Sequence, residues 1–393
     1  MTSSPLQDIL VVDLTRILAG PFATMILGDL GADVIKIERP GQGDDTRHWG
    51  PPFLEGTATY FLSVNRNKRC LTLDLKSAAG SSVLWRLLER ADVLVSNFRP
   101  GLMNELGFGY DDVRRRASRL VYCVINGYGE SDGRASRPAF DLVIQGESGL
   151  MDLTGPADGA ATKAGISIAD EVAGLYLVQG VLAALLKRHR TGRGAHVEIA
   201  LTDALISTFT YQAQQYLTAG MEPRRLGNAH PSLVPYRPFP TADGTVVIGV
   251  ASNSLWQRFC KALELEELVD DARFCTNAGR VERRDELEAL IEERLAERSS
   301  EQWIDRLRAV RVPCGVVRSV AQALDEEIEL DSGLVQESGI PGLQVVGNPI
   351  RIDGSRGEPR LAPPSLGEHT IQILGELGFD SAQIALLRAD GVV

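Results

Sequence analysis

The stretch from Val172 to Leu186 constrains the fold most, because Gln179 is the one strongly polar residue in it. A helix that is apolar on every side is normally buried in a protein core. These fifteen residues fall short of the roughly 20 that a helix needs to cross a bilayer. We therefore expect the central helix of a globular core, with the basic residues 187–190 and Gly192 forming its C-terminus.

Asp170 lies just before this apolar run, at or near the expected start of the helix. A carboxylate in this place has two interpretations. It can be a helix N-cap, which is a common role of aspartate. Alternatively, the positive end of the helix dipole can hold it ionised as a nucleophile. The residues alone favour the cap.

Strands and helices alternate through the first 200 residues, which predicts an α/β fold with a parallel sheet covered on both faces. Ligands bind such sheets beyond the carboxyl ends of the strands, so the residues after each strand are the candidate binding loops. The first of these loops, from Thr15 to Gly20, has no G-x-G-x-x-G fingerprint for a dinucleotide. The expected strands are 9–14, 34–37, 71–75, 93–95, 120–125 and 196–201, and the expected helices include 22–30, 78–90 and 110–117.

The middle of the chain differs in composition. The segment 227–240 is rich in proline and is followed by a hairpin-like run and short charged helices, which predicts a second, smaller α+β domain. We expect a large Rossmann-like domain formed by residues 1–200 and 330–393, a small domain at 225–325, and linkers at 201–224 and 326–329. Within the large domain, residues 140–145 fit either a short helix or a strand.

Charge and cysteine usage exclude several functions. A net charge of −11 argues against a nucleic-acid or anionic-membrane partner, because both require a concentrated positive field. The five cysteines are scattered without a C-x-x-C pair and the histidines have no ligand spacing, so we predict no metal site. The chain starts without a signal-peptide pattern, and we expect a cytoplasmic protein.

Several motifs together resemble the class III CoA-transferase family, which includes formyl-CoA transferase, carnitine CoA-transferases and α-methylacyl-CoA racemase. The similarity runs nearly from end to end at almost constant spacing, so it is more specific than any one motif. The matching segments are 13–15, 19–21, 31–40, 67–69, 97–101, 165–174, 191–194 and 366–369.

The resemblance implies ring-like subunits that interlock in a homodimer. It also implies CoA transfer from an acyl-CoA donor to a carboxylic acid acceptor, through mixed anhydrides and an aspartyl-CoA thioester. Coenzyme A is then a substrate, and no permanently bound cofactor is required. Dicarboxylates such as succinate are plausible from the resemblance, although no residue establishes them.

The resemblance also assigns residues to the site. Asp170 takes the place of the family's nucleophile, and Asp141, behind Phe140, takes the place of an acidic residue beside it. Asp141 could equally be an ordinary turn or cap carboxylate. The family's CoA contacts fall on Leu18, Ala19, Arg39, Leu73, Asp74, Leu75, Lys76, Asn97, Phe98 and Arg99.

Three positions depart from relatives in the family. Leu18 stands where formyl-CoA transferase has Gln, which puts the acyl selectivity in question, and Glu105 stands where many relatives have a basic CoA contact. Phe140 stands where the racemase branch has a proton-transferring His, which weakens the racemase alternative. The other alternative is a CoA-binding protein without catalysis.

Overall fold

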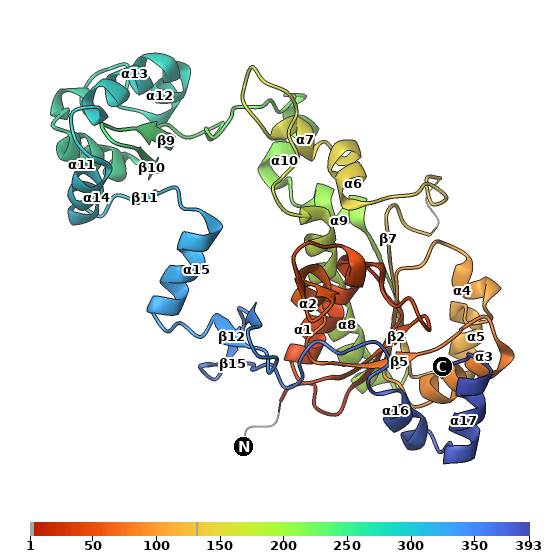
Figure 1. The fold of residues 1–393 in the computed structure, drawn as a ribbon. Helices are drawn as coiled ribbons and strands as arrows, with labels where there is room; N and C mark the ends of the chain where they lie inside the picture. The colour runs from red at the N-terminus through yellow and green to blue at the C-terminus, as the bar shows by residue number, and fades with distance from the viewer. Residues whose placement is uncertain (1–3, 131–132) are drawn as a thin grey trace. The chain divides into compact units, whose positions relative to one another are not determined.

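The computed structural model describes residues 4–130 and 133–393, and the chain divides into two compact units. Unit 1 comprises Met1–Leu150, Ala164–Gln214 and Glu327–Val393, and unit 2 comprises Met151–Lys163 and Gln215–Glu326 (Figure 1).

Unit 1 is built on a six-stranded sheet with the order β5-β2-β1-β6-β7-β8, in which all neighbours are parallel. The predicted α/β fold with a parallel sheet is therefore confirmed. The strands are β1 (Leu10–Asp13), β2 (Asp33–Glu38), β5 (Lys68–Thr72), β6 (Val93–Ser96), β7 (Val121–Asn126) and β8 (His196–Ala200).

Helices cover both faces of this sheet, because parallel strands require crossover connections. On one face, the side chains of β1, β6 and β7 pack in a core with α1 (Ala19–Asp29), α8 (Ile168–Thr191) and α9 (Leu201–Ser207). On the other face they pack with α3 (Ala78–Leu88), α5 (Tyr110–Arg116), α16 (Thr370–Glu376) and α17 (Ser381–Ala389). The N-terminal and C-terminal parts of the chain thus share one core.

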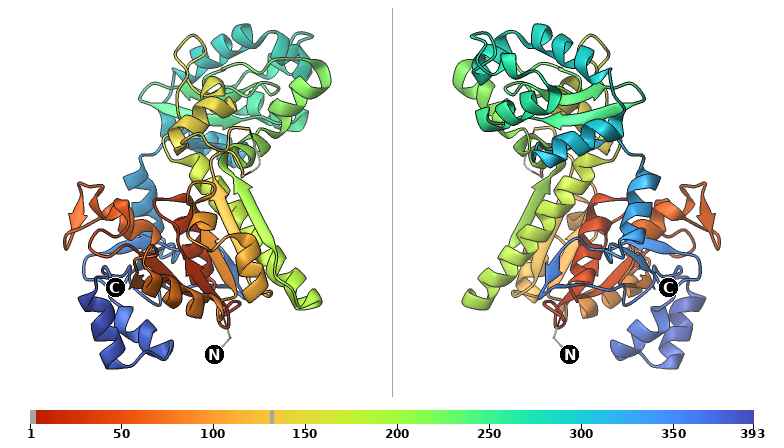
Figure 2. Two further views of the ribbon diagram at one scale, coloured as in Figure 1. Left: turned by 90° about the vertical axis from the view of Figure 1, so that its right-hand side faces the viewer. Right: turned by 90° about the vertical axis from the view of Figure 1, so that its left-hand side faces the viewer.

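Helix α8 is longer than the apolar run predicted, with 24 residues, and it lies along the sheet (Figure 2). Among the described residues it is the one helix long and apolar enough to cross a membrane by length and composition. Its buried face, which includes Leu177 and Val181, packs in the core of unit 1, as expected of the central helix of a globular unit.

The expectation that α8 is buried on every side is wrong for the single chain. Leu175, Leu182 and Leu186 are exposed, and their spacing of seven and four residues aligns them along one stripe of the helix. Helix α8 therefore has two apolar faces. The core of unit 1 buries one of them, and the other is exposed.

Unit 2 contains a three-stranded antiparallel sheet of β9 (Tyr236–Pro240), β10 (Thr245–Gly249) and β11 (Cys314–Val316). The proline-rich segment thus ends in an outer strand, where proline is tolerated. The sheet packs on α11 (Asn253–Leu263), α13 (Arg284–Leu295) and α14 (Ser300–Ala309) around Trp256 and Trp303.

The unit boundaries differ from the expected domains in three places, one of which is the expected linker 326–329, because it forms the end of helix α15 (Val320–Glu329). Residues 151–163 belong to unit 2, where Arg225 pairs with the Asp152 carboxylate at 2.7 Å. The expected linker 201–224 instead contains α9 and α10 (Thr210–Ala219).

The remaining elements are short or connect these layers. They are η1 (Asp45–His48), β3 (Phe53–Leu54), β4 (Thr57–Ala58), α2 (Thr59–Val64), α4 (Leu102–Glu105), α6 (Asp141–Ser148), α7 (Leu150–Leu153), η2 (Glu266–Leu268), α12 (Asn277–Glu282), α15 (Val320–Glu329), β12 (Val335–Glu337), β13 (Gln344–Val346), β14 (Arg351–Ile352) and β15 (Ser355–Arg356). Residues 140–145, for which helix and strand were both open, thus enter helix α6.

Candidate active site

Asp170 occupies the third position of α8, because Ser167 is the N-cap and the helix begins at Ile168. The interpretation of Asp170 as the N-cap is therefore wrong. Its carboxylate lies on the first turn, where the free backbone N–H groups and the helix dipole meet.

Asp141, the first residue of α6, contacts the start of α8 directly. Its Oδ1 accepts a hydrogen bond of 2.8 Å from the backbone N–H of Ala169, and its Oδ2 accepts one of 2.7 Å from Gln145 Nε2. The Gln145 side chain also holds the chain that leads into α8, since its Oε1 accepts from the N–H of Ala164 at 2.8 Å. Asp141 thus caps α8 from a neighbouring segment and also lies beside the proposed nucleophile.

Burial, together with the negative charges of Asp141 and Glu171, raises the pKa of Asp170 to about 7. Burial and the two neighbouring carboxylates therefore oppose the effect of the helix dipole, which favours the ionised form of Asp170. Removal from water disfavours the charged form, and two nearby carboxylates disfavour it further. A carboxylate whose pKa is strongly raised by burial and by neighbouring charges is typical of a functional site.

Tyr60, in α2, belongs to the same electrostatic environment. Burial raises its pKa to about 12, and the charges of Asp170 and Asp141 contribute. Its ring packs edge-on against Trp49, with 5.6 Å between the centroids. Neither Tyr60 nor Trp49 was predicted as a site residue, because neither is part of a motif or follows a strand of the six-stranded sheet.

A cavity of about 370 Å³ lies at the carboxyl ends of β1, β2, β5 and β6. Most of the predicted CoA contacts come together around it. The predicted contacts among its lining residues are Arg39, Leu73, Asp74, Leu75, Lys76, Phe98 and Arg99.

Arg16 lines the same cavity; it lies in the predicted binding loop from Thr15 to Gly20 but was not among the individual predicted CoA contacts. Its guanidinium pairs with Asp45 at 3.2 Å, and Arg39 approaches the same carboxylate at 3.8 Å. Two cations therefore converge at one side of the cavity, an arrangement suited to a phosphate. The position of Arg16 three residues after strand β1 would have indicated a binding role from the sequence alone.

Three predicted contacts are not among the residues that line the cavity. Asn97 instead holds the backbone of Arg16, accepting its N–H at 3.0 Å and donating to its carbonyl at 2.7 Å. Leu18 and Ala19 are buried, and Leu18 packs in a small apolar cluster that includes Tyr60.

Arg99 is paired with Glu105 at 2.5 Å on the protein surface. Glu105 stands where many relatives have a basic CoA contact, and here it forms an ion pair with Arg99. The acidic residue engages one of the cations expected to bind CoA.

The loop from Arg16 to Ala19 connects the cavity with the Asp170 side of the sheet. Arg16 lines the cavity, whereas Gly174, one turn beyond Asp170, lies against the backbone of Ala19. A Cβ added at Gly174 would stand 2.8 Å from the Ala19 carbonyl oxygen, so only glycine permits this close approach.

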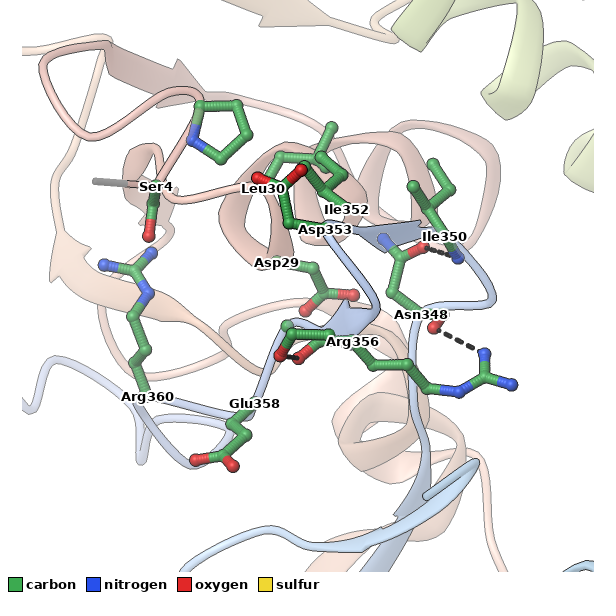
Figure 3. Close-up of a pocket in the computed structure, with 13 residues that line it drawn as sticks. Ser4, Asp29, Leu30, Asn348, Ile350, Ile352, Asp353, Arg356, Glu358 and Arg360 are labelled. Carbon is green, nitrogen blue, oxygen red and sulfur yellow. Dashed lines mark hydrogen bonds between the residues drawn. The ribbon is translucent and has the colours of Figure 1, made fainter. Parts of the chain in front are cut away.

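Another pocket, of about 310 Å³, lies between the end of α1 and the segment 348–360 (Figure 3). None of the predicted site residues lines it, and its ion pair between Asp29 and Arg66 is structural. Across residues 4–130 and 133–393, no group of three or more His, Cys, Asp or Glu side chains has the arrangement of a metal site.

Unit 1 thus carries a cavity at the carboxyl edge of a parallel sheet and a carboxylate with a raised pKa at the start of α8. The chain belongs to CoA-transferase family III, whose model matches residues 6–370. It is a CoA-transferase.

Individual relatives agree with this assignment. The chain is 41% identical to the succinyl-CoA:glutarate CoA-transferase of Mus musculus, over 99% of this chain and 90% of the mouse protein. It is 36% identical to the succinate–glutarate CoA-transferase of Agrobacterium fabrum, over 95% and 96% of the two chains. A crystal structure of a CAIB/BAIF family protein from Brucella suis superimposes with a TM-score of 0.85 at 38% identity, covering 96% of this chain and all of that one.

Proposed function

We propose that this enzyme moves CoA between two carboxylic acids through a covalent thioester on Asp170. The observation that carries the proposal is the position of Asp170, a partly buried carboxylate on the first turn of α8 that does not cap its helix. The loop 16–19 connects this turn with a cavity lined by cations.

The chemistry has four balanced steps. The Asp170 carboxylate attacks the donor thioester, forming a mixed anhydride and releasing the CoA thiolate. The thiolate attacks the aspartyl carbonyl, which forms the aspartyl-CoA thioester and releases the donor acid. The acceptor carboxylate attacks this thioester to give a second anhydride and the thiolate again. The thiolate then attacks the acceptor's acyl carbon, producing the new acyl-CoA and restoring the Asp170 carboxylate.

The protein supplies orientation and electrostatics to these steps. Arg16 and Arg39 fit the phosphates of CoA at the cavity, and the free N–H groups at the start of α8 fit the oxyanion of each tetrahedral intermediate. The protonated hydroxyl of Tyr60 provides a further donor near Asp170. Asp141 holds the backbone beside the nucleophile in place.

We infer that succinyl-CoA is the donor and that a short dicarboxylate such as glutarate is the acceptor. Two relatives named for these substrates cover nearly the whole chain at 41% and 36% identity. Acetyl-CoA with oxalate is the second pair to test, because an acetyl-CoA:oxalate CoA-transferase of Acetobacter aceti is 36% identical.

The racemase alternative is disfavoured. Phe140, the N-cap residue of α6, occupies the position where the racemase branch has a histidine, and a phenyl ring carries no exchangeable proton. Among the relatives described, the names are those of CoA-transferases.

The test is a transfer assay with intermediate trapping. Wild-type enzyme is incubated with succinyl-CoA and each of a panel of acceptor acids, and new acyl-CoA is quantified. Hydroxylamine added during turnover should modify Asp170 alone, as shown by peptide mass spectrometry, and Asp170→Ala should abolish both transfer and trapping. An Asp170→Ala enzyme with the wild-type rate would refute the mechanism.

We also propose that two copies associate through the exposed stripe of α8. Leu175, Leu182 and Leu186 form an apolar surface on a helix whose other face is in the core. Leu182→Glu combined with Leu186→Glu should convert a dimer into a monomer in sedimentation experiments, and a wild-type protein that is monomeric at micromolar concentration would contradict the proposal.

A further inference from the structure

Ile17 has a backbone conformation that branched side chains rarely adopt. Its φ is 73°, in the left-handed region, where a residue branched at Cβ is strained. It lies between Arg16, which lines the cavity, and Leu18, which packs in the cluster that includes Tyr60. Such strain persists only where the surroundings hold the residue in place.

Asp44 supplies the contacts that hold Ile17. Its two carboxylate oxygens both accept from the backbone N–H of Ile17, at 3.3 Å each. The Asp44 side chain is fully buried and pairs with the equally buried ammonium group of Lys36 at 2.9 Å. Lys36 also donates to the carbonyl oxygen of Thr15 at 2.8 Å. The buried ion pair of Lys36 and Asp44 therefore contacts the loop before and after Arg16, at Thr15 and at Ile17.

The same short segment controls the side chain of Arg16. Asp45, the residue after Asp44, pairs with the Arg16 guanidinium at 3.2 Å. The side-chain amide of Asn97 fixes the Arg16 backbone, because its Oδ1 accepts from the Arg16 N–H and its Nδ2 donates to the Arg16 carbonyl. The backbone and the charge of this loop are thus set by residues from three other segments of the chain.

We propose that Asp44, supported by Lys36, is a positioning residue that keeps Ile17 in its left-handed conformation and so aligns Arg16 with CoA and Leu18 with the acyl end of the site. This inference rests on the proposed transfer reaction. If Asp44 no longer accepts from Ile17, the residue relaxes to negative φ, and its two neighbours turn away from their contacts on opposite sides.

The test compares variants that remove the acceptor with variants that remove the strain. In Asp44→Asn, a single oxygen remains to serve Lys36, Thr46 and Ile17. We expect kcat to fall roughly 10- to 100-fold and KM for acyl-CoA to rise, because small misplacements of binding groups are costly in catalysis.

Loss of folding in Asp44→Asn is addressed by a second variant. Lys36→Met combined with Asp44→Leu replaces the buried ion pair by apolar side chains of similar shape, a change that is often neutral for stability. We expect this enzyme to keep a Tm near that of the wild type and to show the same loss of kcat. Adding Ile17→Gly should recover most of the rate, because glycine adopts positive φ without strain.

Thr46→Val is the matched control. Thr46 Oγ1 donates at 2.8 Å to Oδ1 of Asp44, one of the two oxygens that accept from Ile17, so this variant removes a different hydrogen bond of the same carboxylate. Its kcat should stay near the wild-type value. A Lys36→Met/Asp44→Leu enzyme with unchanged kcat and KM would overturn the proposal, and so would a failure of Ile17→Gly to restore activity. If the wild type itself transferred no CoA, the proposed function would fail, and calorimetric CoA affinity of the same variants would test the positioning role separately.

Discussion

The backbone N–H of Ala169 donates a 2.8 Å hydrogen bond to Oδ1 of Asp141. This bond fixes a second carboxylate beside the residue that we propose as the nucleophile. Its charge both stabilises the start of α8 and opposes ionisation of Asp170.

The first prediction concerns the pH dependence of transfer. The pKa of Asp170 is raised to about 7, so the carboxylate is protonated at lower pH and cannot attack. The value of kcat/KM should therefore rise with pH and level off above about 7. Asp141→Asn removes one charge but keeps an acceptor for Ala169, and it should move this rise to lower pH. The control is Glu171→Gln, whose shift should be smaller because Glu171 contributes less to the raised pKa. A profile that does not move in Asp141→Asn would contradict the prediction.

The second prediction concerns stability. The folded pKa of Asp170, about 7, lies above the ordinary aspartate value of 3.8, so the folded state binds the proton more tightly than the unfolded state does. The free energy of unfolding therefore falls as pH rises from about 4 to 7, and the full penalty is present above 7. Asp170→Asn should remove the penalty and stabilise the protein at pH 8 by about 1 kcal/mol or more, with little effect near pH 4. Urea unfolding at both pH values would measure this difference, and equal effects at both would exclude a raised pKa.

The third prediction concerns Tyr60. Since the pKa of its hydroxyl is raised to about 12, the group remains protonated throughout the assay range and can donate. Tyr60→Phe should lower kcat roughly 10- to 100-fold if this donor stabilises an anionic intermediate, with little change in CoA affinity. A matched control is Tyr110→Phe, because Tyr110 stacks on His196 with 4.7 Å between the ring centroids and is not among the residues that line the cavity of Arg16 and Arg39. Equal rates for Tyr60→Phe and wild type would remove Tyr60 from the reaction.

The fourth prediction concerns the pair of Arg99 and Glu105. Both side chains are exposed, so the pair is screened by solvent and its loss should leave Tm unchanged. Glu105→Ala frees the guanidinium for a CoA phosphate and should lower KM for acyl-CoA about two- to fivefold at low salt. Arg99→Ala should raise it. Steady-state kinetics at two ionic strengths would measure KM for acyl-CoA in both variants. A higher KM in Glu105→Ala than in the wild type would contradict the prediction and show that Glu105 orients Arg99 for binding.

Local patterns in the sequence predicted the layers of unit 1 well. Continuous apolar runs such as 121–125 are typical of parallel strands buried on both faces, and the binding loops follow from the direction of those strands. The cavity of about 370 Å³ therefore lies where the strand ends indicated.

Long-range contacts were not predictable in this way. Nothing in the local sequence indicates that Lys36, within an apolar strand, pairs with Asp44, or that the charge of Asp170 acts on Tyr60. The two faces of α8 have the same apolar composition, so the pattern could not show that one of them is left uncovered by the single chain. The positive φ of Ile17 was also not predictable, because residues branched at Cβ rarely adopt positive φ.

The contribution of the chain's final residues to unit 1 has a consequence for biosynthesis. The backbone N–H of Asp74 donates to the carbonyl of Val392, and the N–H of His369 donates to the carbonyl of Cys70. All six strands have left the ribosome long before these partners emerge, so one apolar face of the sheet lacks its last two helices during most of translation. The nascent chain should therefore engage chaperones until residues 369–392 have emerged, and ribosome-stalled chains ending near residue 360 should be sensitive to protease.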